Sequence, residues 1–208
     1  MKGLGYLVLL ALAPGQLLAQ ARPSLGIELG YARADFVGPG AGGVTQREGA
    51  VAGAYFRIPL SGWLALQPGL LISSKGGATE VADTSASPLR LELDLVYLDL
   101  PLVLRARLPF LLGTRLIVLG GGAPEARIGC NVESFRNDIS LGLSACERAS
   151  TASFRTWDVS VMGGVGLGIP IEKSELAFEA RLSRGLRSVT DVGQIYNRSL
   201  EFLLSVPF

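Results

Sequence analysis

The stretch WDVSVMGGVGLGI, residues 157–169, alternates between two kinds of side chain. Apolar residues occupy most of its odd positions, from Trp157 to Ile169, and polar residues, glycine or Met162 occupy its even positions. Side chains of a β-strand point alternately to its two faces, so this period of two predicts a strand with one apolar face and one polar or small face.

The same period recurs along the chain and gives eight expected strands, at residues 24–36, 47–58, 63–74, 89–108, 114–130, 152–169, 175–188 and 196–208. The links after the second, fourth and sixth strands are short, whereas the other links are longer and polar. Short turns at one end and long loops at the other are typical of an outer-membrane barrel, with periplasmic turns and extracellular loops. An even number of strands places both ends of the barrel chain on the periplasmic side.

One expected strand, at residues 89–108, changes its phase. Its apolar residues occupy odd positions up to Leu95 and even positions from Val96 onward. A slip of one residue within a strand is what a β-bulge produces, so we predict a bulge near Leu95–Val96. Two shorter strands joined by a bend are the alternative.

Alternation alone does not distinguish a soluble barrel or sandwich, with its apolar face inside, from a membrane barrel, with its apolar face outside. Charges of both signs lie at mid-strand opposite the apolar faces, and glycines beside them leave room for long arginine side chains. The interior of an eight-stranded barrel is just wide enough to be filled by side chains. We therefore predict an all-β, eight-stranded, antiparallel, up-and-down transmembrane β-barrel, in preference to a soluble barrel. The charges expected to form a network in its lumen are Glu28, Asp99, Arg105, Glu125, Arg127, Asp158, Glu179, Arg181 and Glu201.

The last expected strand contains LEFLLSVPF, residues 200–208, whose apolar positions include Phe202, Leu204, Val206 and Phe208. An alternating apolar last strand that closes on phenylalanine is typical of the insertion signal read by the barrel-assembly machinery. We expect Phe208 at the periplasmic boundary of the bilayer, where aromatic girdles lie.

The first 21 residues have the features of a signal peptide. Lys2 is followed by an apolar run over Leu4–Ala13 that Pro14 ends, and small residues suited to cleavage follow in LLAQA. An uncleaved membrane anchor is the alternative, although ten apolar residues are short for a membrane-spanning helix. We expect a signal peptide over residues 1–21, a barrel domain over residues 22–208, and export to the bacterial outer membrane.

Cys130 and Cys146 lie 16 positions apart in a polar stretch, and in an oxidising compartment we expect them to form a disulfide. Two unpaired thiols are the alternative. The chain has no histidine, which excludes a Ser–His–Asp triad and a histidine metal site, and we predict no enzyme, metal or cofactor. Its 19 basic and 18 acidic residues balance, so we expect no nucleic-acid partner.

Several stretches, taken in order, resemble one known family: QPGLLISSKGG (67–77), YLDLPLVLRARL (97–108), VLGGGAPEARI (118–128), GVGLGIPI (164–171), LAFEARLSRGLRSV (176–189) and the last strand. They resemble the outer-membrane β-barrel domain family that is often labelled PorT-like or "porin family". The resemblance covers essentially the whole mature chain and implies an eight-stranded, exported barrel of bacterial outer membranes.

A barrel filled with side chains acts mainly through its loops or through partner proteins. We therefore expect surface binding, or docking of an envelope partner, by the extracellular loops. The alternatives are a purely structural membrane protein and a transporter of small hydrophobic ligands. The expected partners are outer-membrane lipid, the barrel-assembly machinery during insertion, and an extracellular or envelope protein.

Overall fold

The computed structural model describes residues 23–81, 89–137, 139–146, 154–171, 174–191 and 193–208. The expected signal peptide, residues 1–21, lies outside the described residues. Within these ranges there are one 3-10 turn, η1 (Leu111–Gly113), and eleven strands: β1 (Ser24–Val37), β2 (Val44–Thr45), β3 (Arg47–Pro59), β4 (Leu64–Val81), β5 (Leu89–Asp99), β6 (Leu102–Pro109), β7 (Arg115–Arg136), β8 (Ile139–Ala145), β9 (Trp157–Ile171), β10 (Ser174–Gly185) and β11 (Tyr196–Pro207). Among the described residues, no helix has the length and apolar character needed to cross a bilayer.

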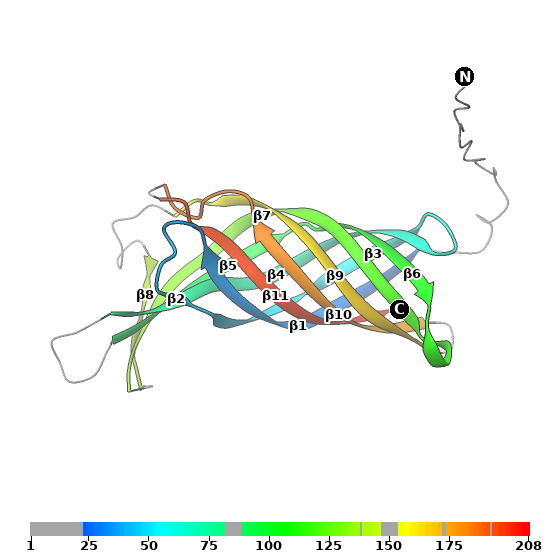
Figure 1. Cartoon of the computed structure of the whole chain (residues 1–208), viewed down its shortest axis with the longest axis horizontal. Helices are drawn as coiled ribbons and strands as arrows, with labels where there is room; N and C mark the ends of the chain where they lie inside the picture. Colours follow the sequence, from blue (N-terminus) through cyan, green and yellow to red (C-terminus); the bar gives the residue numbers. More distant parts are fainter. Residues whose placement is uncertain (1–22, 82–88, 138, 147–153, 172–173, 192) are drawn as a thin grey trace, which may run out of the picture.

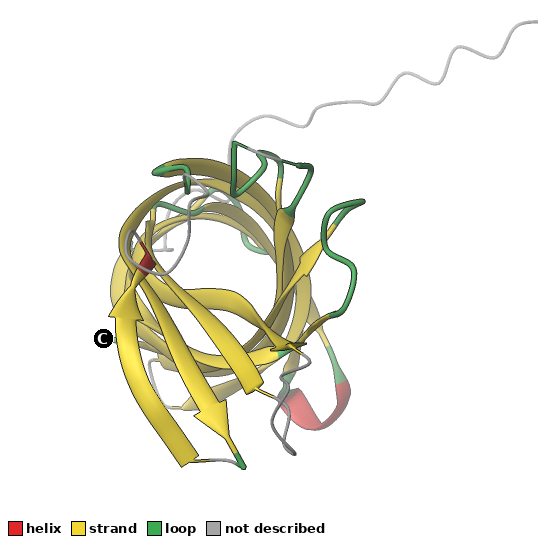
Figure 2. Ribbon diagram, turned by 90° about the vertical axis from the view of Figure 1, so that its left-hand side faces the viewer, coloured by secondary structure: helices red, strands yellow, loops and turns green. Residues whose placement is uncertain are grey.

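The strands close into a ring with eight antiparallel positions (Figures 1 and 2). The ring runs β1–β3–β4, then β5 and β6, then β7–β9–β10–β11, and the pairing of β1 with β11 closes it. β2 and β8 pair only with β4 and β7, respectively, among the described residues. β5 and β6 share one position, since both lie between β4 and β7. The predicted eight-stranded antiparallel barrel is therefore confirmed.

The break between β5 and β6 falls at Leu100–Pro101. Proline has no backbone N–H and cannot donate to the sheet. The chain nevertheless stays in place there, because Leu100 N donates to the Pro124 carbonyl and Gly69 N donates to the Pro101 carbonyl. The expected strand at 89–108 is thus one wall of the barrel, divided by a proline.

The barrel has two different ends. Its turn end holds the start of β1, the end of β11 and the short links after β3, β6 and β9, and its loop end holds the long connections (Figure 1).

At the loop end the strands run further than the sequence suggested. β4 continues to Val81 and β7 to Arg136, and β7 turns back as β8. Residues 75–81, 131–136 and 139–145, which were expected to lie in loops, are therefore sheet.

The apolar faces point outward and the charged faces point inward. Leu29 is 54% exposed and Val165 55%, whereas Arg105 is 0% and Glu28 1% exposed. A soluble barrel would show the opposite arrangement. The apolar outer belt matches the lipid-facing surface of a membrane barrel.

A bulge lies beside the predicted place, but it belongs to β7 and not to β5, so it does not cause the change of phase. The pairing of β5 with β7 shifts between Val96 and Tyr97, and the extra residue is Ile128 of β7. β5 itself keeps strict alternation against β4, so Leu95 and Tyr97 both point inward and are both fully buried. The prediction of a slip within this strand is wrong.

The phase changes because the surroundings of the barrel change. Towards the loop end, the inward positions become apolar and form a small core of Leu93, Leu95, Tyr97, Phe36, Cys130, Phe154 and Val189. The outward positions become polar, and Arg47 contacts Asp94 at 3.0 Å and Glu92 at 3.5 Å. This part of the barrel is built like a soluble barrel, which indicates that it stands above the bilayer.

Candidate functional site

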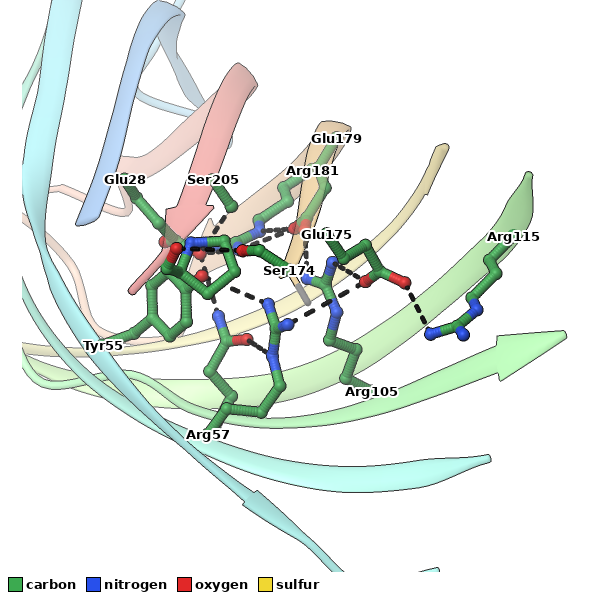
Figure 3. A network of polar contacts seen from close by, with 12 residues as sticks. Glu28, Tyr55, Arg57, Arg105, Arg115, Ser174, Glu175, Glu179, Arg181 and Ser205 are labelled. Atoms are coloured by element: carbon green, nitrogen blue, oxygen red, sulfur yellow. Dashed lines mark hydrogen bonds and ion pairs between the residues drawn. The ribbon is translucent and has the colours of Figure 1, made fainter. Parts of the chain in front are cut away.

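The lumen near the turn end is filled by a cluster of ion pairs, which we call the turn-end cluster (Figure 3). Its members are Glu28, Arg57, Gln67, Arg105, Glu175, Glu179 and Arg181. They come from β1, β3, β4, β6 and β10, so the cluster ties together walls that are not neighbours in the ring.

Arg181 is the centre of the turn-end cluster. Its Nη2 donates to Glu28 Oε1 at 2.6 Å and to Glu179 Oε2 at 2.7 Å, and its Nη1 donates to Glu28 Oε2 at 3.0 Å. Arg105 Nη1 donates to the other oxygen of Glu179. Buried charges are tolerated when they are paired and hydrogen-bonded, and each of these four side chains is at least 96% buried.

The remaining members extend the turn-end cluster toward the barrel opening. Gln67 Nε2 donates to Glu28 at 2.8 Å, and Arg57 Nε donates to Gln67 at 3.2 Å. Glu175 lies 3.9 Å from Arg57 and 3.8 Å from Arg105, and it accepts from the partly exposed Arg115 at 3.1 Å. Arg57 and Glu175 were not predicted from the sequence, although Arg57 lies two residues after the inward-facing Tyr55 and so shares its face.

A second cluster lies nearer the loop end. Lys75 Nζ contacts Glu125 Oε1 at 2.6 Å and Asp99 Oδ2 at 3.5 Å, and Ser73 Oγ donates to Asp99 at 2.6 Å. Lys75 is 3% exposed and was also missed, because its stretch was assigned to a loop. In sequence, it lies two residues after Ser73 and so shares the inward face.

The other predicted lumen residues lie apart from these ion pairs. Glu201 is buried and accepts from Ser199 Oγ at 2.7 Å. Arg127 donates to the carbonyls of Phe154 and Arg155. Asp158 Oδ1 accepts from the backbone N–H groups of Val159 and Arg187. Arg127 and Asp158 therefore hold loop-end backbone in place.

Glycines make room for the side chains of the lumen. A Cβ atom at Gly53 would lie 2.1 Å from the Leu70 carbonyl oxygen, and one at Gly30 would lie 2.3 Å from the Phe202 carbonyl oxygen. Neighbouring walls therefore approach more closely at these positions than any larger residue allows. The described residues contain no group of three or more Cys, Asp or Glu side chains placed to hold a metal ion.

The loop end presents a disulfide-linked hairpin. A disulfide joins Cys130 in β7 to Cys146, the residue after β8, as predicted. The bond closes the base of the β7–β8 hairpin. Every residue of β8 is exposed, including Ile139 at 67%, Leu141 at 56% and Leu143 at 64%.

An apolar cavity of about 360 Å³ also opens at the loop end. Its lining includes Phe36, Leu91, Leu93, Val132, Phe154 and Ile195, with the hydroxyls of Thr79 and Thr190 beside them. Pockets of roughly 300–1,000 Å³ with mostly apolar walls are typical of small-molecule sites.

The residues of the expected insertion signal lie on the outer surface of β11 and just beyond it. Phe202 is 49% exposed, Val206 37% and Phe208 72%, and Leu204 is half-buried in the same row. Their recognition by the assembly machinery stays a prediction.

Solved structures of small outer-membrane barrels resemble this chain in fold. Neisserial surface protein A matches with a TM-score of 0.49 at 7% identity, over 90% of this chain and all of the other. Ail of Yersinia pestis, solved with the heparin analogue sucrose octasulfate, matches at 0.44 and 12% identity, with the same coverage. OprG from Pseudomonas aeruginosa matches at 0.39 and 11% identity, over 89% of this chain and 95% of OprG.

No curated protein matches the sequence. Residues 18–191 do match the family model described as the outer membrane protein beta-barrel domain. Because this match covers most of the chain, the protein belongs to this family of outer-membrane β-barrels.

Proposed function

We propose that this small barrel of the bacterial outer membrane is not an enzyme and acts by binding a protein partner at its loop end. The observation that supports this proposal best is the β7–β8 hairpin, with its exposed and uncharged edge strand. A partner that approaches from the cell surface could reach this hairpin.

β8 is built for pairing with another strand. Among the described residues it pairs with β7 only, so its other edge has free backbone donors and acceptors. Natural edge strands are usually protected by charges, proline or short length. The β8 sequence, ISLGLSA, has seven residues with no charge and no proline. An extended segment of a partner could add to this edge through main-chain hydrogen bonds.

The disulfide supports the same role. A hairpin that stands alone in water is only marginally stable. The Cys130–Cys146 bond holds the two strands of this hairpin together at their base. A surface held in its binding conformation loses less entropy when a partner binds.

The test is capture of partners from intact envelopes with a tagged protein. The variant L141K/L143K places two charges on β8, and L111K/L112K places the same charges on exposed leucines at the turn end. We expect the natural protein and the turn-end variant to retain the same partner, and the β8 variant to lose it at least about tenfold. Equal recovery by all three proteins would argue against the hairpin.

The apolar loop-end cavity favours a second candidate, binding of a small hydrophobic ligand. A bulky side chain at Leu93, as in L93W, would fill the cavity from its wall. Native mass spectrometry with dodecanoic acid as probe should then detect binding by the natural protein and not by L93W. Because side chains fill the lumen, we expect no ion conductance in planar bilayers from either protein. An open conductance would favour a channel instead.

A further inference from the structure

We infer that Arg33, Arg184 and Arg198 form a site for a phosphorylated lipid headgroup on the outer surface of the barrel. This site goes beyond the proposed partner binding and does not depend on it. We call these three residues the arginine arc.

The arginine arc lies where the apolar belt ends on three adjacent strands. The outward face changes from Leu182 to Arg184 on β10, from Leu200 to Arg198 on β11, and from Tyr31 to Arg33 on β1. In each strand the arginine is the first polar outward residue on the loop-end side. The boundary between acyl chains and headgroups therefore passes beside all three.

The sheet register brings these arginines together. Arg184 is directly opposite Arg198, and Arg33 is opposite Leu200, the residue two positions after Arg198. Directly opposite side chains have Cβ atoms about 4.5–5.5 Å apart, and diagonal neighbours lie about 7–8 Å apart. Like charges in opposite positions destabilise a sheet unless an anion lies between them.

The carboxylates nearby do not neutralise the arginine arc. Asp35 accepts two hydrogen bonds from Arg198, at 2.9 and 2.5 Å. Glu48 lies 3.8 Å from Arg33, but both side chains are more than half exposed, so this pair is weak. Arg184 has no ion-pair partner within the described part of the chain. Three cations thus face two anions.

On three other strands the apolar outward face ends at a residue that is not cationic. Their first polar outward residues are Glu48 on β3, Ser74 on β4 and Asp94 on β5. Asp94 is already paired with Arg47 at 3.0 Å. Compared with β3, β4 and β5, the β10–β11–β1 side of the barrel therefore has a cationic edge.

An apolar groove lies further toward the turn end, and Tyr31, Leu182 and Leu200 separate it from the arginine arc. It has a volume of about 650 Å³ and is lined by Leu29, Val165, Leu167, Phe178, Phe202 and Leu204, among others. An acyl chain lying in this groove would bring its headgroup to the arginines. Guanidinium groups bind phosphate through two parallel hydrogen bonds, so a lipid phosphomonoester fits both the groove and the arc. A free anion would use only the arc.

The test measures lipid binding to the purified full chain in detergent by native mass spectrometry. The probe is diphosphorylated lipid A, with the fully dephosphorylated lipid as its partner probe. The variant R184Q/R198Q removes the opposite pair of charges. R90Q/R155Q removes two partly exposed arginines elsewhere at the loop end as a matched control. A heat-modifiable gel shift checks that every variant is folded.

We expect lipid A to bind the natural protein and the control alike. It should bind the R184Q/R198Q variant about 10- to 100-fold more weakly, the loss that removal of one hydrogen bond to a charged group gives. The dephosphorylated lipid should bind the natural protein as weakly as lipid A binds the R184Q/R198Q variant. R184Q alone keeps the Asp35 pair and should show part of the loss if the double variant does not fold. Equal binding by all variants, or equal binding of both lipids, would overturn the assignment. Full competition by millimolar inorganic phosphate would also overturn it and indicate a free-anion site.

Discussion

Replacing Arg181 with methionine tests whether ion pairs hold the barrel walls together. Methionine resembles the apolar stem of arginine and carries no charge. The change removes the only described cation that contacts Glu28, and one of the two that contact Glu179. Both carboxylates stay in a lumen that is closed to water, with Glu28 1% and Glu179 4% exposed.

The size of the effect depends on the hydrogen-bond donors that each carboxylate retains. Breaking a buried pair by removing one partner costs about 3–5 kcal/mol. Glu28 retains two neutral donors, Gln67 at 2.8 Å and Ser205 at 3.1 Å, and Glu179 retains Arg105. We therefore expect R181M to lower the free energy of unfolding by about 3 kcal/mol, at the lower end of that range. Adding E28Q should recover at least half of the loss, because it removes the unpaired charge.

Urea titration of the protein in lipid vesicles measures these values, with the folded fraction read from gel migration before and after boiling. R90M is the control, since Arg90 is 44% exposed and makes a surface pair with Glu92 at 2.7 Å. Such pairs contribute about 0–1 kcal/mol. If R181M unfolds at the same urea concentration as R90M, or if E28Q destabilises R181M further, the turn-end cluster does not act as described.

Three further changes test other parts of the structure. L29R places a charge on the apolar belt and should lower the free energy of unfolding in vesicles by about 2–4 kcal/mol. L143R lies above the belt and should hardly change it. Equal effects of the two variants would contradict the assignment of the belt to lipid. G53V should prevent appearance of the heat-modifiable form, because its Cβ would lie 2.1 Å from a carbonyl oxygen, and G62V, with open space around it, should not. Reduction of the disulfide should expose the β7–β8 hairpin to limited proteolysis and leave the barrel folded; resistance of the reduced hairpin would show that β-pairing alone holds it.

The sequence predicts the fold well because each barrel strand repeats a period of two. It predicts the inward faces outside β5, and Glu28, Arg105, Glu179 and Arg181 do lie together in the lumen. It does not predict which charges meet. A contact such as Arg105 with Glu179 joins β6 to β10 across the lumen, and its geometry depends on strand tilt and stagger, which have no local sequence pattern.

The failed prediction in β5 shows what a change of phase means in this kind of protein. A bulge moves side chains to the other face of a strand that stays in one solvent. β5 instead crosses from lipid into water, so its outward side changes from Val96, Leu98 and Leu100 to Asp94, Glu92 and Arg90 without any slip. Its inward side changes in the opposite sense, from Asp99 to Leu95 and Leu93. The position at which the outward face changes from apolar to polar therefore marks the membrane boundary. The outward face makes the same change at Arg33, Arg184 and Arg198. The variant L98D tests this boundary. It should lower the free energy of unfolding in lipid vesicles if residue 98 faces lipid, and should hardly change it if residue 98 faces water.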